Sequence, residues 1–113
     1  MNDEYEKCSG NMRALNDALY VIGGKWRIPI LGSILAGNHR FREIERSIPK
    51  LSTKVLSTEL KILEQNYLLT RTVIEDTSVT ILYKPTEHAI TLGKVLDELI
   101  KWGQAHGQKI REV

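Results

Sequence analysis

The sequence has few of the residues that build metal centres, disulfides or membrane spans. It has one cysteine, Cys8, so it can form neither an intramolecular disulfide nor a multi-cysteine metal site. The three histidines show no ligand spacing, and no apolar run approaches the roughly 20 residues of a membrane span. No nucleophile–base pair or paired carboxylates stand out, and Gly23-Gly24-Lys25 lacks the rest of a phosphate loop. We therefore expect no catalytic residue, cofactor, metal or membrane partner.

The bulk composition is that of one small globular domain. The 113 residues are 42% hydrophobic and 27% charged, enough for one core. The polar, acidic stretch at residues 1–7 does not resemble a secretory signal, which predicts a cytoplasmic protein. No linker or low-complexity run interrupts the chain. We expect a flexible N-terminal arm at residues 1–10, ending in Ser9-Gly10, and a single domain over residues 11–110.

Apolar residues recur at helical spacing along the first half of the chain. They predict helices over residues 11–22, about 26–36 and 41–48. The pair Gly23-Gly24 ends the first helix, and these glycines let two helices meet at a sharp turn. Pro29 is compatible with the second helix only in its first turn, where backbone N–H groups lack helical partners. Pro49 closes the short third helix.

Residues 52–66 carry the most informative pattern, a helix capped by Ser52. Its inner stripe follows the helical positions i, i+4, i+7 and i+11, namely Leu56, Leu60, Leu63 and Tyr67. The other face, near the N-terminus, carries only short polar groups and two cations: Thr53, Lys54, Ser57, Thr58 and Lys61. Such a face suits the major groove of DNA, although a solvated amphipathic helix shows the same pattern when taken alone.

The pattern then changes to the alternation of β-strands. Residues 69–75 and 79–84 alternate around the turn-like trio 76–78, which predicts a β-hairpin over residues 68–85. Thr86 can cap a last helix over residues 86–108. This helix has more apolar surface than a small monomer usually covers, which predicts a dimer helix with interface residues Leu92, Val95, Leu96, Leu99 and Trp102.

The order of elements predicts a mainly α fold with a small β-hairpin, a winged helix-turn-helix. Only residues 49–51 separate the third and fourth helices, about the length of a helix-turn-helix turn. In that geometry the helix over 52–66 enters the major groove and the hairpin, as the wing, reaches along the DNA. The first and last helices flank this unit.

Positive charge is concentrated in the same region. Residues 37–61 contain six Lys or Arg and three Glu, although the formal net charge of the whole chain is only +2. We expect Arg40, Arg42 and Lys50 to hold phosphates, and the free N–H groups at Ser52 to bind another. Base edges or phosphates would be met by Thr53, Lys54, Ser57, Thr58 and Lys61, and Arg71 adds a cation from the wing.

With these features in place, the chain resembles the HxlR-type bacterial transcription regulators, relatives of the MarR regulators. The segments that carry the resemblance are Ile22-Gly23-Gly24-Lys25-Trp26, Gly37-Asn38-His39-Arg40-Phe41-Arg42-Glu43-Ile44, the leucine-spaced run 52–64, Tyr83 with Thr86, and Trp102-Gly103. The resemblance implies a homodimer that binds operator DNA through the helix at 52–65. It also implies a dimer built from the first and last helices, which adds Leu15 and Leu19 to the expected interface.

The resemblance also raises the question of redox sensing. Some members of the family sense oxidants or electrophiles through an N-terminal cysteine. Many place it where this chain has Arg13, and Cys8 lies five residues earlier. Cys8 is therefore a candidate redox sensor, and an inert thiol is the alternative.

The leading interpretation is a homodimeric, sequence-specific transcriptional regulator that acts on a palindromic operator, with redox or electrophile sensing as an added hypothesis. Its partners would be double-stranded DNA and a second copy of the chain, and no residue pattern identifies a small-molecule effector. The alternative is a winged-helix protein-interaction module without specific DNA binding, which the modest net charge also fits. Trp26 and Trp102 could stack on a ligand, but core or dimer-interface positions suit these aromatics better.

Overall fold

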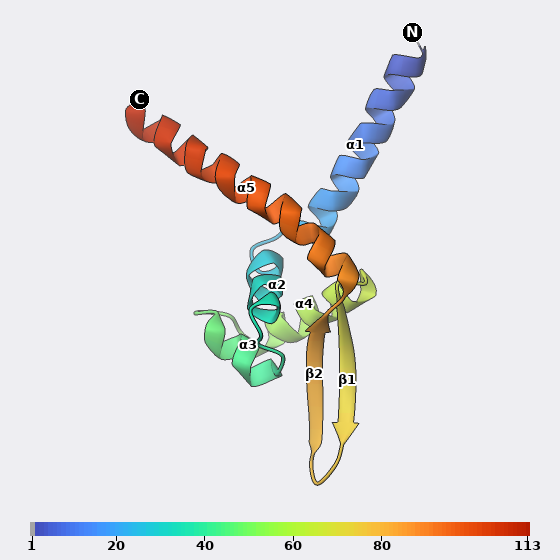
Figure 1. Ribbon diagram of the computed structural model, residues 1–113, viewed down its shortest axis with the longest axis vertical. Coiled ribbons are helices and arrows are strands. Elements are labelled where there is room, and N and C mark those ends of the chain that lie inside the picture. The colour runs from blue at the N-terminus through green and yellow to red at the C-terminus, as the bar shows by residue number, and fades with distance from the viewer. Residues whose placement is uncertain (1) are drawn as a thin grey trace.

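A computed structural model describes the backbone of residues 2–113 and the side chains of residues 7–113. The chain forms α1 (Asn2–Ile22), α2 (Arg27–Leu35), α3 (Phe41–Ser47), α4 (Thr53–Gln65), β1 (Leu69–Glu75), β2 (Val79–Pro85) and α5 (Glu87–Glu112). Figure 1 shows a small body of α2, α3, α4 and the base of the hairpin. The two long helices α1 and α5 leave it as arms on one side, and the hairpin leaves on the opposite side. The predicted winged helix-turn-helix architecture is confirmed.

The hydrophobic core lies where α2, α3 and α4 meet the base of the hairpin. Burying one leucine or isoleucine side chain contributes about 1.5–3 kcal/mol, so a cluster of this size accounts for the cohesion of the body. The inner leucines of α4 are fully buried, as the sequence predicted. The buried apolar residues are Ile30, Leu31, Ile34, Ile44, Leu51, Leu56, Leu60, Leu63, Leu68, Leu69 and Ala89.

The two strands pair antiparallel, from Leu69 opposite Pro85 to Glu75 opposite Val79. Only the base of this hairpin is anchored in the body. The backbone N–H of Tyr83 donates to the carbonyl of His39 at 2.7 Å, which ties β2 to the segment before α3. Beyond its buried first residue, every residue of β1 is exposed. The hairpin therefore projects into solvent as a wing (Figure 1).

The ends of both arms differ from the sequence-based boundaries. Residues 2–10 of the predicted arm at residues 1–10 form the first turns of α1, so this helix begins earlier than the expected residue 11, and residue 1 lies outside the described residues. One glycine in a helix costs only about 1 kcal/mol relative to alanine, so Gly10 does not stop it. Helix α5 likewise runs through Gly103 and Gly107 and ends at Glu112 rather than at residue 108.

Tyr67 does not continue the inner stripe of α4, and that part of the prediction is wrong. The helix ends at Gln65, and the following residues turn back on it. The N–H of Leu68 donates to the carbonyl of Leu63, and that of Tyr67 to the carbonyl of Glu64, each at 3.0 Å, which is a Schellman motif. Tyr67 occupies its left-handed position with φ 61°. Its side chain consequently points out of the core and is 77% exposed.

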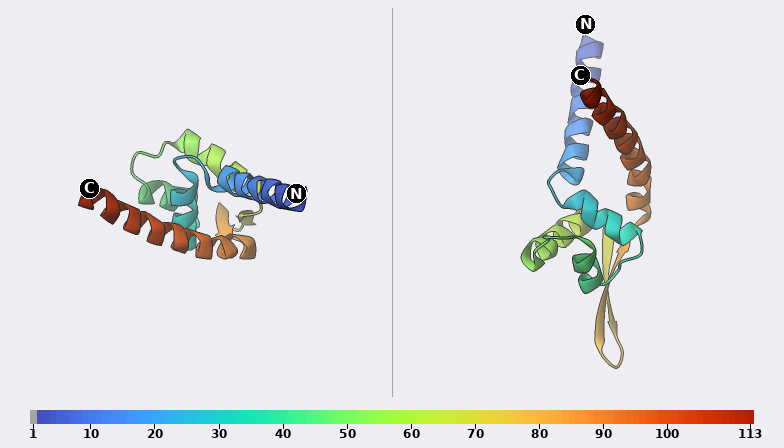
Figure 2. Two further views of the ribbon diagram at one scale, coloured as in Figure 1. Left: turned by 90° about the horizontal axis from the view of Figure 1, so that it is seen from above. Right: turned by 90° about the vertical axis from the view of Figure 1, so that its left-hand side faces the viewer.

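The turn between α1 and α2 depends on its two glycines, as the sequence predicted. Gly24 has φ +83°, which side chains rarely adopt, and a Cβ on Gly23 would lie 2.5 Å from the Leu19 carbonyl oxygen. The chain thus leaves α1 abruptly and enters α2 across the top of the body (Figure 2). Within the part of the chain that the structure describes, no helix has the length and apolar character needed to cross a bilayer.

Candidate nucleic-acid interface

The helix-turn-helix is held together by polar contacts on α3 as well as by the core. The hydroxyl of Ser47 donates to the carbonyl of Ile44 at 2.7 Å, and its oxygen lies 2.6 Å from the Ser33 hydroxyl of α2. The side-chain amide of Asn38 donates to that same Ser33 oxygen at 3.1 Å. Buried Ser33 therefore has a donor and an acceptor as partners, and it fixes α3 against α2 without an unpaired polar atom.

The starts of α3 and α4 are both capped by side chains. The Glu43 carboxylate accepts from the N–H groups of His39 and Arg40, each at 3.2 Å, and so ties the first turn of α3 to the two residues that precede it. The Ser52 hydroxyl accepts from the N–H of Val55 at 3.1 Å. Ser52 thus acts as the predicted N-cap, and its own O–H proton stays available to donate outward.

The outer face of α4 presents the residues that the sequence singled out. Lys54, Ser57 and Lys61 are exposed and extend from consecutive turns. Two neighbours already have partners: the Thr53 hydroxyl donates to the Glu45 carboxylate at 2.5 Å, and the Thr58 hydroxyl donates to the Lys54 carbonyl at 3.1 Å. Both threonine oxygens can still accept, so the face keeps two cations, one free hydroxyl and two acceptors.

The wing and α4 enclose a polar hollow of about 340 Å³ that brings together cations from both elements. Lys61 lines it from α4 and Arg71 from β1, with Ser57 at the same wall. Arg71 lies directly opposite Tyr83 in the hairpin, so Tyr83 also faces this hollow. Sequence reasoning missed Tyr83 and Glu64 as part of the site. The strand alternation together with the register could have placed Tyr83, whereas the depth of the groove depends on tertiary packing.

A second hollow, of about 450 Å³, separates α3 from β2 and is rimmed by arginines. Arg40 and Arg42, both predicted to hold phosphates, line it together with Arg46. The helical i, i+4 spacing from Arg42 was the available signal for Arg46, which the predicted set omitted. Arg42 is 80% exposed and lies 3.9 Å from Glu45, an ion pair too solvated to restrain it. Lys50 is exposed in the turn before α4, with φ 69°.

The arms carry most of the exposed apolar surface. Of the predicted interface residues, Leu15, Leu19, Val95, Leu99 and Trp102 are exposed and Leu96 is half-buried. Leu92 differs, because it packs against the core. Trp102 stacks on His106 with ring centroids 4.9 Å apart and leaves 66% of its surface exposed. Five further exposed apolar residues lie on the arms outside the predicted interface set: Met12, Tyr20, Ile90, Ile100 and Ile110.

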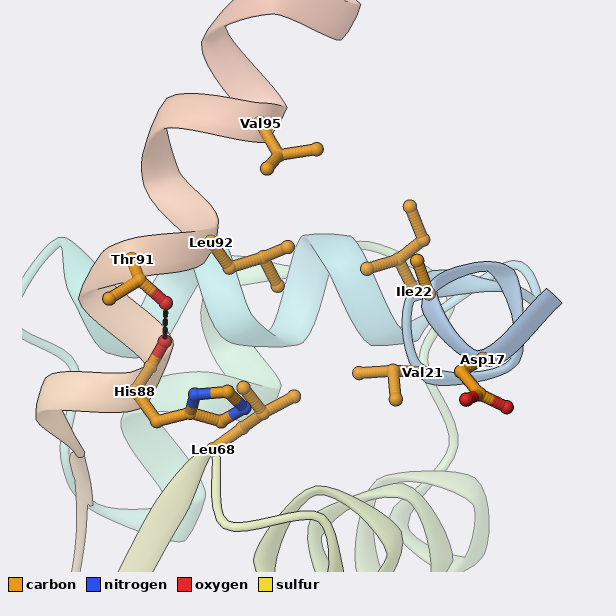
Figure 3. A pocket seen from close by; sticks show the side chains of 9 residues that line it. Asp17, Val21, Ile22, Leu68, His88, Thr91, Leu92 and Val95 are labelled. Atoms are coloured by element: carbon orange, nitrogen blue, oxygen red, sulfur yellow. Dashed lines mark hydrogen bonds between the residues drawn. The ribbon is translucent and has the colours of Figure 1, made fainter. Parts of the chain in front are cut away.

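Where the arms meet the body they leave an apolar hollow of about 270 Å³. Ile22 of α1 and Leu92 of α5 approach it from opposite sides, above Leu68, and Val95 closes its upper end (Figure 3). The Asp17 carboxylate at the rim points away from it (Figure 3). Among the described residues, no group of three or more His, Cys, Asp or Glu could hold a metal ion.

A capped helix with a polar cationic face, set behind a short helix and beside a β-hairpin, defines a winged helix-turn-helix DNA-binding protein. Comparison with known proteins supports this class and also identifies the family. Residues 21–111 match the model of the family described as HxlR-like helix-turn-helix. The chain belongs to this family, and it is a transcriptional regulator of the helix-turn-helix type rather than an enzyme.

Solved relatives share the fold and 25–35% of the aligned sequence. The transcriptional regulator YodB of Bacillus subtilis is 35% identical over 88 residues, which is 78% of this chain and 79% of YodB. Its reduced form superposes with a TM-score of 0.74 over 79% of this chain and 87% of that one. A MarR-family regulator from Enterococcus faecalis superposes with a TM-score of 0.81 and 25% sequence identity, over 90% of this chain and 93% of that one. The redox regulator HypR in its reduced form superposes with a TM-score of 0.78 and 26% sequence identity, over 88% of this chain and 99% of that one.

Proposed function

We propose that the protein acts as a homodimer that binds a palindromic operator, with one α4 helix in each of two successive major grooves. The observation that carries this proposal is the pair of arms, which present apolar side chains on two helices that leave the body together. Monomeric proteins rarely leave such contiguous apolar surface uncovered. A second copy of the chain is the simplest partner that buries this surface, because its own arms present the same apolar side chains.

Within each half of this dimer, the contacts with DNA divide by chemistry. Lys54, Ser57 and Lys61 face outward from α4 and would meet base edges or the phosphates beside them. Arg40, Arg42 and Arg46 would hold the backbone on the α3 side, and Arg71 with Lys61 would hold it between α4 and the wing. The remaining predicted contacts are Lys50, Ser52, Thr53 and Thr58 around the start of α4.

Selection of bound sites from a random DNA library, followed by titration of the winner at two salt concentrations, tests this proposal. We expect a two-fold symmetric motif whose half-sites lie about one helical turn apart, roughly 34 Å, with affinity well above that for scrambled DNA. Weak binding without an enriched motif would favour the alternative, a winged-helix module that contacts proteins.

The dimer itself is tested by Trp102→Asp. Because Trp102 is largely exposed on α5, the change leaves the body intact and places a charge in the proposed interface. We expect monomers in sedimentation at concentrations where the wild type is dimeric, and weaker operator binding with them. Lys101→Met is the matched control, since Lys101 carries only an exposed ion pair with Glu98. A variant that stays dimeric would move the interface elsewhere.

We also propose that oxidation of Cys8 changes DNA binding. Two observations support this: the thiol is exposed on α1, one of the two arms, and YodB has been solved in diamide-treated and quinone-bound forms. A modified thiol on the arm would alter the surface that meets the second copy. We expect diamide to weaken operator binding by the wild type but not by Cys8→Ser. Equal affinities for both proteins, with and without diamide, would remove the idea.

A further inference from the structure

One side chain joins the first arm to the helix that meets DNA. Arg27, the first residue of α2, places its Nε 2.9 Å from Oε2 of Glu59 on α4. Its Nη1 donates to the backbone carbonyl of Tyr20 on α1. The guanidinium carbon lies 5.3 Å from the centre of the Tyr20 ring. A single arginine therefore contacts both the arm and the recognition helix.

The contact with α1 falls where that helix needs a partner. Tyr20 lies within the last turn of α1, whose carbonyls have no N–H donor from the helix itself. A cation at this end also opposes the partial negative charge of the helix terminus. Arg27 thus caps α1 from the neighbouring helix, after the chain has turned through Gly23 and Gly24.

The contact with α4 falls on the flank of the recognition helix. Glu59 lies near its middle, between the buried leucines and the outward face of Lys54 and Lys61. The Arg27 and Glu59 side chains are only 15% and 19% exposed, so water screens this pair far less than the surface ion pairs. A guanidinium is planar and always charged, which lets it serve two acceptors in a fixed geometry.

The two arms differ in what else holds them. Helix α5 is capped by Thr86, whose hydroxyl donates to the Tyr67 carbonyl at 2.6 Å, and Ala89 in its first turn is fully buried. Among the side chains that the structure describes on α1, those of residues 7–22, none belongs to the buried core, and every residue from Gly10 to Tyr20 is exposed. Its direction depends on the glycine turn, on the packing of its last residues and on Arg27.

We propose that Arg27 is a positioning residue that sets the angle between α1 and α4, and through the dimer sets the distance between the two recognition helices. This inference rests on the proposed function, in which α1 forms part of the dimer. Arg27 need not touch DNA for this role. It would act by making one separation of the half-sites fit better than its neighbours.

The experiment uses the full chain and operators whose half-sites are moved apart or together in single base-pair steps, with a DNA that carries one half-site as reference. Arg27→Met removes both contacts at similar length. Arg27→Lys keeps a charge beside Glu59 but lacks the second nitrogen that donates to the Tyr20 carbonyl. Lys101→Met is the control for losing a cation elsewhere. Thermal unfolding and sedimentation establish that each variant is folded and dimeric.

We expect the wild type and Lys101→Met to prefer one separation. For Arg27→Met, the ratio of the affinity at the preferred separation to the affinity at neighbouring separations should fall about five- to tenfold, while its affinity for the single half-site stays unchanged. The ratio for Arg27→Lys should lie between those of the wild type and Arg27→Met. Equal losses at every separation and at the half-site, or no loss, would overturn the inference. If Arg27→Met does not fold, an unchanged separation profile for Arg27→Lys overturns it. A wild type without any preferred separation would instead refute the proposed function.

Discussion

Tyr67 sits in a backbone conformation that its side chain does not favour, and replacing it should stabilise the protein. The residue has φ 61° at the end of α4, where a Schellman motif most often has glycine. Its ring is 77% exposed, so removing it gives up little packing. The Tyr67 carbonyl accepts a hydrogen bond from the Thr86 hydroxyl, and any substitution keeps this bond because the acceptor is a backbone atom.

The magnitude follows from two opposing terms. A left-handed conformation costs an L-residue roughly 1–2 kcal/mol, which glycine does not incur. Glycine loses more backbone entropy on folding, a cost of about 0.5–1 kcal/mol relative to alanine. Tyr67→Gly should therefore raise the free energy of unfolding by about 0.5–1 kcal/mol.

Urea unfolding followed by circular dichroism measures this change, and Tyr67→Ala is the matched control. Alanine removes the same ring but keeps the Cβ, so Tyr67→Ala should be no more stable than the wild type. The difference between the two variants isolates the backbone term. If glycine and alanine give the same free energy of unfolding, the left-handed conformation at residue 67 carries no strain and the reasoning fails.

Two further substitutions test the start of the recognition helix. Lys50→Gly should also relieve a left-handed residue, φ 69°, so the fold becomes more stable while the lost cation lowers the salt slope of DNA binding by about one. Finding both properties unchanged would mean that Lys50 is neither strained nor near phosphate. Ser52→Ala removes the hydroxyl that caps α4 and should cost about 1 kcal/mol in urea unfolding. Ser52→Asn should retain most of that stability, and a Ser52→Ala protein as stable as the wild type would show the cap to be dispensable.

The sequence predicted the elements that depend on local pattern. The leucines of α4, the cap at Ser52 and the glycine turn before α2 follow from periodicity and backbone chemistry within a few residues, and the structure has each of them. The end of α4 did not follow, because Tyr67 continues the apolar spacing but stands where the chain reverses. Pattern alone does not register a backbone reversal made by a residue other than glycine.

Contacts between distant segments were also out of reach. Arg27 and Glu59 lie 32 residues apart, and neither charge stands out among its neighbours in the sequence. The hollow shared by Lys61 and Arg71 likewise exists only because the wing folds back beside α4. The exposed polar face of α4 could therefore be predicted, whereas the grooves between elements and the connection from the arm to α4 required the fold.

The base of the wing has a consequence for how the protein can vary. Thr86 donates its N–H to the Leu68 carbonyl at 3.3 Å and its hydroxyl to the Tyr67 carbonyl, so the chain leaves α4 and re-enters α5 at nearly one point. The tip of the hairpin, beyond the contacts at its base, can therefore change in length without moving the point where α4 ends or the point where α5 begins. Insertions at residues 76–78 would lengthen its reach along DNA while the arms and α4 keep their places. The footprint on DNA can change in this way without rebuilding the domain.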